Sequence, residues 1–208
     1  MEAKCVFCNA DSFKGRVVAE DKNFWVVPTK GQITDGGYLL IIPKKHYRCI
    51  GEMESDVAGE LTTLNDYLRG VLVGEYNSLV SGFEHGIGGQ SIPHAHWHLF
   101  PAPVDFTARI ANDFQSCETN TLISLRDVPR SFNLTKESYL LWQTPDGLLR
   151  ACYMNAGPQS VPMQYLRTVA AQLLNRPERG NWRTMDPALD DRLCEETVQR
   201  MAKYFKPR

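Results

Sequence analysis

Three of the five histidines in this 208-residue chain fall at alternate positions, His94, His96 and His98, and this spacing constrains the local fold strongly. Alternate residues of a β-strand project from one face, whereas two steps along a helix turn the side chain by about 200°. The intervening Ala95 and Trp97 are apolar and suit a core. The pattern therefore predicts a strand with three imidazoles on one face, able to ligate metal, attack phosphorus or bind phosphate.

The pair Cys5 and Cys8 has the C-x-x-C spacing of redox sites and of zinc half-sites, and two ordinary buried thiols are a third interpretation. A redox pair normally follows a strand of a βαβ unit, and only four residues precede Cys5. This favours zinc, which needs two further nitrogen or sulfur ligands. One candidate is His46, and the other is His94 or His85. The remaining cysteines lack metal spacing and are expected in the core: Cys49, Cys117, Cys152 and Cys194.

A wider segment around the histidines resembles a known family. Residues 88–101, GGQSIPHAHWHLFP, resemble the signature of the histidine triad (HIT) superfamily of nucleotide hydrolases and transferases, His-x-His-x-His followed by two apolar residues. Residues 38–46, YLLIIPKKH, and the cysteine pair also resemble parts of that family. The resemblance covers residues 1–105. It implies an α+β fold, with a HIT-like antiparallel sheet and a long amphipathic helix.

The resemblance also implies roles for individual residues. The middle histidine of the family is its nucleophile, so His96 would attack the α-phosphorus of a nucleoside phosphate anhydride, ester or phosphoramidate and form a nucleotidyl-histidine intermediate. His98 would be the second catalytic residue, as a donor to a phosphate oxygen or an aid to the leaving group. Gln90 and Ser91 match positions that contact the phosphate. A structural Zn²⁺ would be held by four ligands: Cys5, Cys8, His46 and His94.

Three function classes follow from the resemblance. The leading one is a nucleotide hydrolase, and a nucleotidyltransferase or phosphorylase would use the same intermediate with another acceptor. A non-catalytic protein that binds nucleotides or RNA ends is the third, and a zinc-stabilised structural domain is the plainest alternative. The expected partner is a small-molecule nucleotide, and a homodimer stays open. Ribose recognition is expected to differ from small relatives, because residues 27–30 lack their acidic residue and Phe83 replaces an asparagine; Glu84 is a candidate substitute.

Periodicity predicts the main elements of the first half. Residues 24–27 and 38–42 are rich in β-formers and predict two antiparallel strands around a turn. Apolar residues at helical spacing predict a long amphipathic helix over about 52–78. Four glycines within residues 82–89 predict a loop that leads into the histidine strand and lets backbone amides approach an anion.

Patterns in the second half predict a hairpin over residues 138–153, a helix with Pro162 in its first turn and another helix from about Asp190. These elements resemble the C-terminal extension of longer bacterial HIT proteins and, loosely, the C-terminal segments of CwfJ-like proteins. We therefore expect a HIT domain at 1–105 and a C-terminal α+β extension at 106–208 that packs on it. Aromatic and Arg side chains of the extension are candidates for substrate contact: Trp142, Trp182 and Arg183.

Composition places further limits. The chain holds 23 basic and 24 acidic residues, a net charge of −1, and 43% of its residues are hydrophobic, enough for a sizeable core. The basic residues form no concentrated stripe, so binding to a nucleic-acid backbone is not indicated. The sequence has neither a hydrophobic signal segment nor an apolar run of about 20 residues, so neither export nor a membrane span is expected. The expected location is the cytoplasm, where cysteines stay reduced and available to metal.

Overall fold

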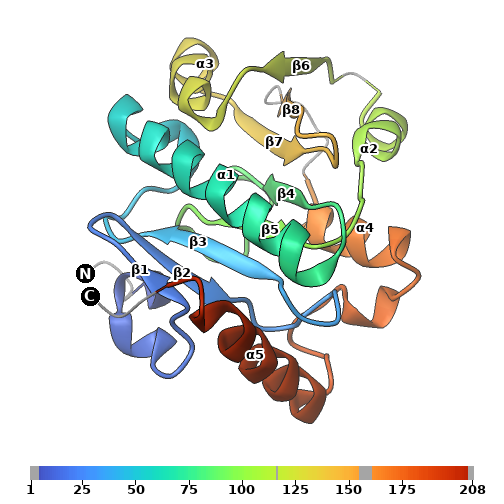
Figure 1. Ribbon diagram of the computed structural model, residues 1–208. Coiled ribbons are helices and arrows are strands. Elements are labelled where there is room, and N and C mark those ends of the chain that lie inside the picture. Colours follow the sequence, from blue (N-terminus) through green and yellow to red (C-terminus); the bar gives the residue numbers. More distant parts are fainter. Residues whose placement is uncertain (1–4, 116, 155–160, 206–208) are drawn as a thin grey trace.

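The computed structural model describes residues 5–115, 117–154 and 161–205, which form an eight-stranded antiparallel sheet flanked by helices (Figure 1). The strand order is β1-β2-β3-β5-β4-β7-β8-β6. The strands are β1 (Ala19–Glu20), β2 (Phe24–Pro28), β3 (Leu39–Pro43), β4 (Ser81–Glu84), β5 (Trp97–Phe100), β6 (Thr119–Leu122), β7 (Ser138–Gln143) and β8 (Leu149–Met154).

Helices cover both faces of this sheet. The α-helices are α1 (Ser55–Tyr76), α2 (Thr107–Asp113), α3 (Val128–Thr135), α4 (Tyr165–Leu173) and α5 (Pro187–Ala202). Short 3-10 helices are η1 (Val6–Cys8), η2 (Ala10–Phe13), η3 (Ile50–Glu52), η4 (Leu125–Asp127) and η5 (Pro177–Arg179). Helix α1 packs on one face. On the other face pack α4 and the N-terminal segment, which holds η1 and η2.

Most of the predicted regular elements are confirmed. Strands β2 and β3 pair antiparallel with Val26 opposite Ile41, and the hairpin of β7 and β8 lies where the turn residues indicated. The long helix is α1, and the two C-terminal helices are α4 and α5. The α+β class and the antiparallel sheet are therefore as expected.

The histidine segment differs in one respect from the prediction of a continuous strand. Only His98 lies within β5, and His94 and His96 occupy the irregular backbone just before it. The expected alternation still holds, because Trp97 and Leu99 enter the core on the α1 side while His98 faces the opposite side. His94 precedes the paired part of the strand, so the hydrogen bonds of the sheet do not determine on which side its side chain lies.

The glycine-rich segment was expected to be a loop, and this prediction is wrong for Gly82. Gly82 lies inside β4, where a Cβ atom would come within 2.7 Å of the Trp97 indole ring. Glycine is therefore required in this central strand because the Trp97 ring leaves no room for a Cβ atom. Gly86, with φ of +59°, makes the turn that leaves the strand.

The sheet continues across the predicted domain boundary at residue 105. Strand β4 pairs with β7, so that Phe83 lies opposite Trp142, and β7 and β8 extend the sheet. Backbone hydrogen bonds between β4 and β7 thus join the two halves of the chain in one sheet. The division into two domains stays a prediction.

Residues 107–135 hold elements that no periodicity predicted, namely α2, β6 and α3. Each is short, and β6 is a half-exposed edge strand without alternation of buried residues. Cys152 of β8 is fully buried in the core and Cys117, next to β6, is partly buried against it, as expected, but the two form a disulfide that the sequence did not predict. The pairing could not be inferred from cysteines separated by 35 positions in the chain.

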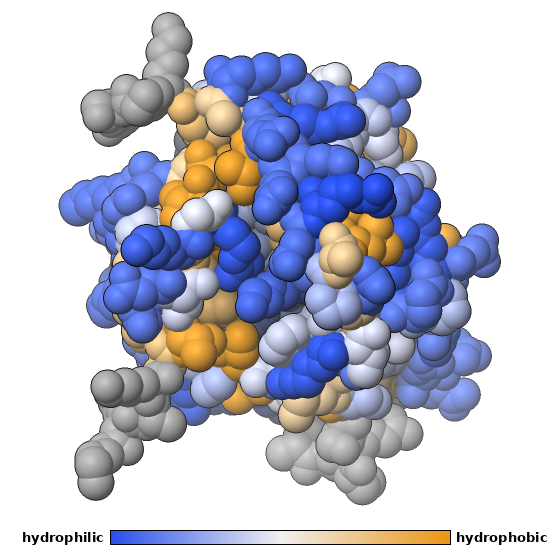
Figure 2. All heavy atoms as spheres, turned by 90° about the horizontal axis from the view of Figure 1, so that it is seen from below, coloured by the Kyte–Doolittle hydropathy of each residue, from blue (hydrophilic) through white to orange (hydrophobic). Residues whose placement is uncertain are grey.

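The surface carries no extended apolar face in the view of Figure 2, where hydrophobic side chains form separate patches among hydrophilic ones. In the described parts of the chain, no helix is both long enough and apolar enough to cross a membrane.

A buried carboxyl group lies where the two halves meet. Glu84 of β4 accepts hydrogen bonds from the Tyr139 hydroxyl (2.6 Å) and the Ile50 backbone N–H (2.9 Å). Burial raises the pKa of this carboxyl from 4.5 to about 8, although the two hydrogen bonds act in the opposite direction.

This pKa predicts a pH dependence of stability. Between pH 4.5 and 8 the unfolded chain releases a proton that folded Glu84 retains, so the free energy of unfolding falls as pH rises and then levels off above pH 8. Glu84→Gln should remove this component of the slope in urea unfolding measured from pH 5 to 9. Glu195→Gln, at an exposed position, is the matched control. An unchanged slope in Glu84→Gln would contradict the prediction.

Candidate functional site

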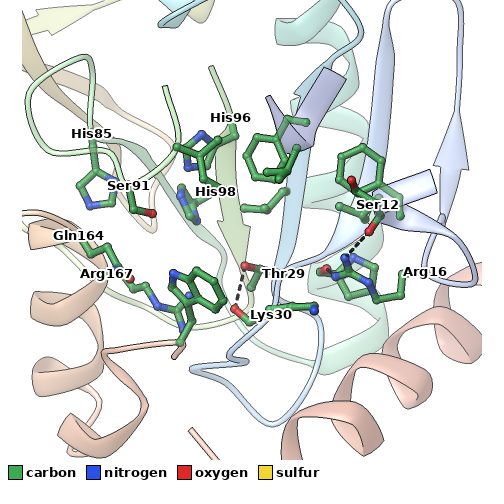
Figure 3. Close-up of a pocket in the computed structure, with 18 residues that line it drawn as sticks. Ser12, Arg16, Thr29, Lys30, His85, Ser91, His96, His98, Gln164 and Arg167 are labelled. Carbon is green, nitrogen blue, oxygen red and sulfur yellow. Dashed lines mark hydrogen bonds between the residues drawn. The ribbon is translucent and has the colours of Figure 1, made fainter. Parts of the chain in front are cut away.

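A cavity of about 380 Å³ opens on the sheet face opposite α1 (Figure 3). The N-terminal segment forms one wall, and the C-terminal half forms the other through Gln164, Arg167 and Trp182. The floor comes from the sheet and the histidine segment. Its apolar lining residues are Val6, Phe7, Phe13, Val27, Pro28, Leu40 and Ile92.

His96 lines this cavity and is almost completely buried. Its Nδ1 lies 2.6 Å from the carbonyl oxygen of His94. A carbonyl can only accept, so Nδ1 carries the hydrogen and Nε2 keeps its lone pair. Burial lowers the pKa of His96 to about 4, which keeps the ring neutral. The Phe7 ring, with its centroid 5.2 Å from that of His96, adjoins the imidazole on the apolar side.

His98 lies beside His96, with ring centroids 4.8 Å apart. Its Nδ1 is hydrogen-bonded to the Tyr38 hydroxyl at 2.7 Å, and its ring stacks on Phe83 at 4.2 Å with an interplanar angle of 16°. Its Nε2 is buried and has no hydrogen-bond partner among the described residues. Burial, together with His96 and His85 nearby, lowers the pKa of His98 well below 6.5.

A third histidine, His85, also lines the cavity. Its Nε2 accepts a hydrogen bond from the Leu166 backbone N–H at 3.1 Å, so the neutral ring carries its hydrogen on Nδ1. Gln164 precedes α4 in the left-handed conformation, with φ of +62°, and its N–H donates to the Gly89 carbonyl. Its Oε1 is buried without a hydrogen-bond partner in the described part of the chain.

The charged residues of the lining are all cationic: Arg16, Lys30 and Arg167. Figure 3 shows Arg167 and Gln164 on one side of the cavity and Arg16 with Ser12 on the other. Among the described lining residues there is no carboxylate. An anionic ligand would therefore meet positive charge and neutral imidazoles without repulsion from an acid.

Cys5, Cys8, His46 and His94 form a second group, beside the cavity, with ligand atoms within 4.8 Å of one another. Sγ of Cys8 lies 3.3 Å from Nδ1 of His46, and Sγ of Cys5 lies 3.4 Å from Nδ1 of His94. A tetrahedral Zn²⁺ site has edges of about 3.5 Å, given bonds of about 2.0–2.3 Å. The group therefore has the size and chemistry to hold zinc.

The ring of His94 is oriented for such a role. Its Nε2 donates to the Pro43 carbonyl oxygen at 2.8 Å, which leaves the lone pair on Nδ1 facing the thiols of Cys5 and Cys8. A backbone acceptor on the far nitrogen is the usual way in which proteins orient a ligating histidine. His85, the alternative fourth ligand, lies in the cavity and not in this group.

The other sequence-predicted residues are placed as follows. Ser91 lines the cavity, whereas the Gln90 side chain lies outside the lining and its Nε2 donates to the Arg48 carbonyl oxygen. Trp182 lines the cavity, and the exposed Arg183 stacks on its ring at 4.5 Å. Two further candidates lie away from the cavity: Trp142 is fully buried in the core, and Glu84 is bound to Tyr139.

Sequence reasoning missed Tyr38, Arg16, Lys30 and Arg167 as parts of the site. Arg167 carried a weak signal, because a cation adjacent to the apolar stripe of a predicted helix must find buried acceptors. It is almost completely buried and donates to the carbonyl oxygens of Gly31, Arg179 and Gly180. Tyr38 carried no signal, since its partner lies 60 residues away.

Comparison with known proteins gives one curated relative and several solved structures. No family model matches the chain. It is 24% identical to zinc finger CCCH domain-containing protein 64 of Arabidopsis thaliana, in an alignment 218 positions long that covers 98% of this chain and 34% of the relative. The chain thus spans about a third of the length of this curated relative.

The solved structures that the chain resembles include histidine triad proteins. A hypothetical histidine triad nucleotide-binding protein from Sulfolobus tokodaii is 28% identical over 47% of this chain and 68% of its own, with a TM-score of 0.43. A HIT family protein from Bacillus anthracis is 24% identical over 49% and 75%, with a TM-score of 0.45. Yeast Ap4A phosphorylase is 13% identical over 96% and 81%, with a TM-score of 0.46.

The role of Arg167 in building the cavity wall gives a prediction. Arg167→Leu leaves three carbonyl oxygens without their buried donor and should lower the free energy of unfolding by about 2–4 kcal/mol. Arg176→Leu removes only a surface ion pair to Asp35 and should cost less than about 1 kcal/mol. Urea unfolding measures both, and equal losses would show that the buried guanidinium does not hold the wall.

Proposed function

We propose that this chain is a nucleotide hydrolase of the histidine triad kind, which cleaves a nucleoside phosphate anhydride, ester or phosphoramidate. The observation that carries the proposal is the hydrogen bond from Nδ1 of His96 to the His94 carbonyl, inside a cavity that contains no carboxylate among its described lining residues. This hydrogen bond leaves the lone pair of the buried imidazole on Nε2, free to attack a nucleotide in the cavity. A nucleophilic histidine needs such an orientation.

The lining supports a nucleotide as substrate. The apolar wall with Phe7 and Leu40 provides a surface for a nucleobase next to His96, and the cations Arg16 and Lys30 provide charge for phosphate oxygens. The acid that small relatives use for ribose is absent, so we propose that neutral acceptors such as Gln164 Oε1 take its place.

The proposed reaction has two steps. Nε2 of His96 attacks the α-phosphorus, the bond from phosphorus to the leaving group breaks, and the leaving group departs with the electron pair and takes up a proton. Water then attacks the phosphorus of the nucleotidyl-histidine, the phosphorus–nitrogen bond breaks, and its electron pair returns to Nε2 while the water gives up a proton. His98 and Ser91 donate to the phosphate oxygens. A transferase or phosphorylase would differ only in the second acceptor.

The proposed nucleophile can be tested directly. His96→Ala should lower kcat by about 10⁴-fold or more while the fold persists, and His98→Ala should lower it by about 10²-fold, because only a donor is lost. Activity is assayed on adenosine phosphoramidates, dinucleoside polyphosphates and nucleoside diphosphates, with and without inorganic phosphate, so that product identity separates hydrolysis from phosphorolysis.

Trapping provides the second measurement. Rapid quenching with α-³²P-labelled nucleotide under conditions that preserve phosphorus–nitrogen bonds should yield labelled wild-type protein and unlabelled His96→Ala. Full activity in His96→Ala, or turnover without any labelled intermediate, would contradict the covalent mechanism.

We also propose that Cys5, Cys8, His46 and His94 hold a structural Zn²⁺. Two sulfur and two nitrogen ligands suit zinc, and a site closed by four protein ligands suits structure rather than catalysis. The metal would join the N-terminal segment, which carries Phe7 and the apolar wall, to the end of β3 and the histidine segment.

Loss of one thiolate should release the metal. Wild-type protein purified without chelator is expected to contain one zinc per chain by elemental analysis, and Cys8→Ser to contain much less and to melt at a lower temperature. Cys194→Ala changes a buried cysteine outside the group and should keep its zinc. Wild-type protein without zinc, or full occupancy in Cys8→Ser, would overturn the assignment.

A further inference from the structure

The two neighbouring imidazoles of the cavity are hydrogen-bonded in different ways. His96 uses Nδ1 to donate to a carbonyl oxygen, whereas Nδ1 of His98 faces a hydroxyl group, that of Tyr38 at 2.7 Å. A hydroxyl can donate or accept, so the direction of this hydrogen bond decides which nitrogen of His98 carries the hydrogen.

The surroundings of Tyr38 decide the direction. Its side chain is fully buried, and in the described part of the chain the only hydrogen-bond acceptor at its hydroxyl is Nδ1 of His98. If Nδ1 carried a hydrogen, the phenolic hydrogen would be buried without a partner, at a cost of about 1–3 kcal/mol. The Arg167 guanidinium, 5.4 Å from the Tyr38 ring centre, can only donate. The Tyr38 O–H therefore donates to Nδ1.

This direction leaves the hydrogen of His98 on Nε2, the atom that is buried without a partner beside His96. We propose that Tyr38 is a positioning residue that holds His98 in its Nε2–H tautomer, so that a neutral His98 donates to the phosphate oxygen of the bound nucleotide. The inference rests on the proposed function for its substrate, but the tautomer itself is a property of the free protein.

The arrangement gives the two rings complementary roles. Nε2 of His96 presents a lone pair, and Nε2 of His98 presents a hydrogen, with ring centroids 4.8 Å apart. Stacking on Phe83 fixes the plane of the His98 ring, and the Tyr38 hydrogen bond fixes its tautomer. A donor prepared in this way needs no reorganisation when charge develops on the phosphate.

Tyr38→Phe tests the role in turnover. The substitution keeps the ring that packs against Phe100 and removes only the hydroxyl. We expect kcat to fall about 10- to 100-fold, the usual cost of removing a partner that orients a functional histidine, with KM changed much less. Tyr165→Phe is the matched control, because it removes a hydroxyl bound to Asp113 outside the cavity, and it should keep wild-type kcat.

Nitrogen NMR of the histidine rings tests the tautomer without any turnover. In ¹⁵N-labelled wild-type protein, with His98 assigned by its loss in His98→Gln, the hydrogen should reside on Nε2, and in Tyr38→Phe a population with the hydrogen on Nδ1 should appear. Adenosine 5′-monophosphate should shift the Nε2–H signal of the wild type.

The outcomes separate this inference from the proposed function. A hydrogen on Nδ1 in the wild type, an Nε2–H signal that saturating nucleotide leaves unchanged, or wild-type kcat in Tyr38→Phe would overturn it. The expected tautomer and nucleotide shift in a protein that hydrolyses none of the substrates would support the positioning role and count against the hydrolase. If Tyr38→Phe does not fold, the wild-type measurements still decide.

Discussion

The site depends on how Trp97 is held. This residue lies between His96 and His98 in sequence, and its indole enters the opposite side of the sheet, packs against Gly82 and donates to Asn65 of α1 at 2.9 Å. Asn65 in turn donates to Gln143 of β7. Because side chains alternate across a strand, fixing Trp97 on the α1 side directs His98 to the cavity side. One buried ring thus ties α1, β4, β5 and β7 to the geometry of the histidines.

His94 serves two sites at once. Its ring faces the cysteines, with Nε2 bound to Pro43, while its carbonyl oxygen accepts the hydrogen bond that orients His96. Both interactions require irregular backbone, since a residue paired in the ladder would have its direction and its carbonyl committed to a neighbouring strand. The shortness of β5 is therefore what allows three alternate histidines to face two different environments.

Much of this could be predicted from local patterns. Alternation and helical spacing identified β2, β3, α1 and the C-terminal hairpin, because each element places its apolar residues at a fixed period over enough positions. Strand β4 was missed because Gly82 is needed to make room for the Trp97 ring, and that ring is 15 positions away in the chain and adjacent only in space. Short elements such as β6 offer too few residues for a period to be detected.

The site divides in the same way. The histidines and the cysteine pair are dense local patterns and were found, and the geometry then placed His94 with the cysteines and His85 in the cavity. Tyr38 and Arg167 act through partners 60 and 136 positions away, so no window of sequence contains both ends of either interaction. Their roles follow from hydrogen-bond satisfaction in a buried site, which only the folded arrangement defines.

The C-terminal half completes the cavity rather than merely adding to the sheet. The Arg167 side chain binds the carbonyl oxygen of Gly31, just after β2, and those of residues 179 and 180, which lead to Trp182 in the wall. Gln164 is held by Gly89 at the other end of the same wall. A chain ending near residue 105 would keep the histidines but lose this wall, His85's partner Leu166 and the cation over Tyr38. The chemistry that the histidine pattern suggests therefore depends on a cavity wall supplied by residues 164–182, which lie outside that pattern.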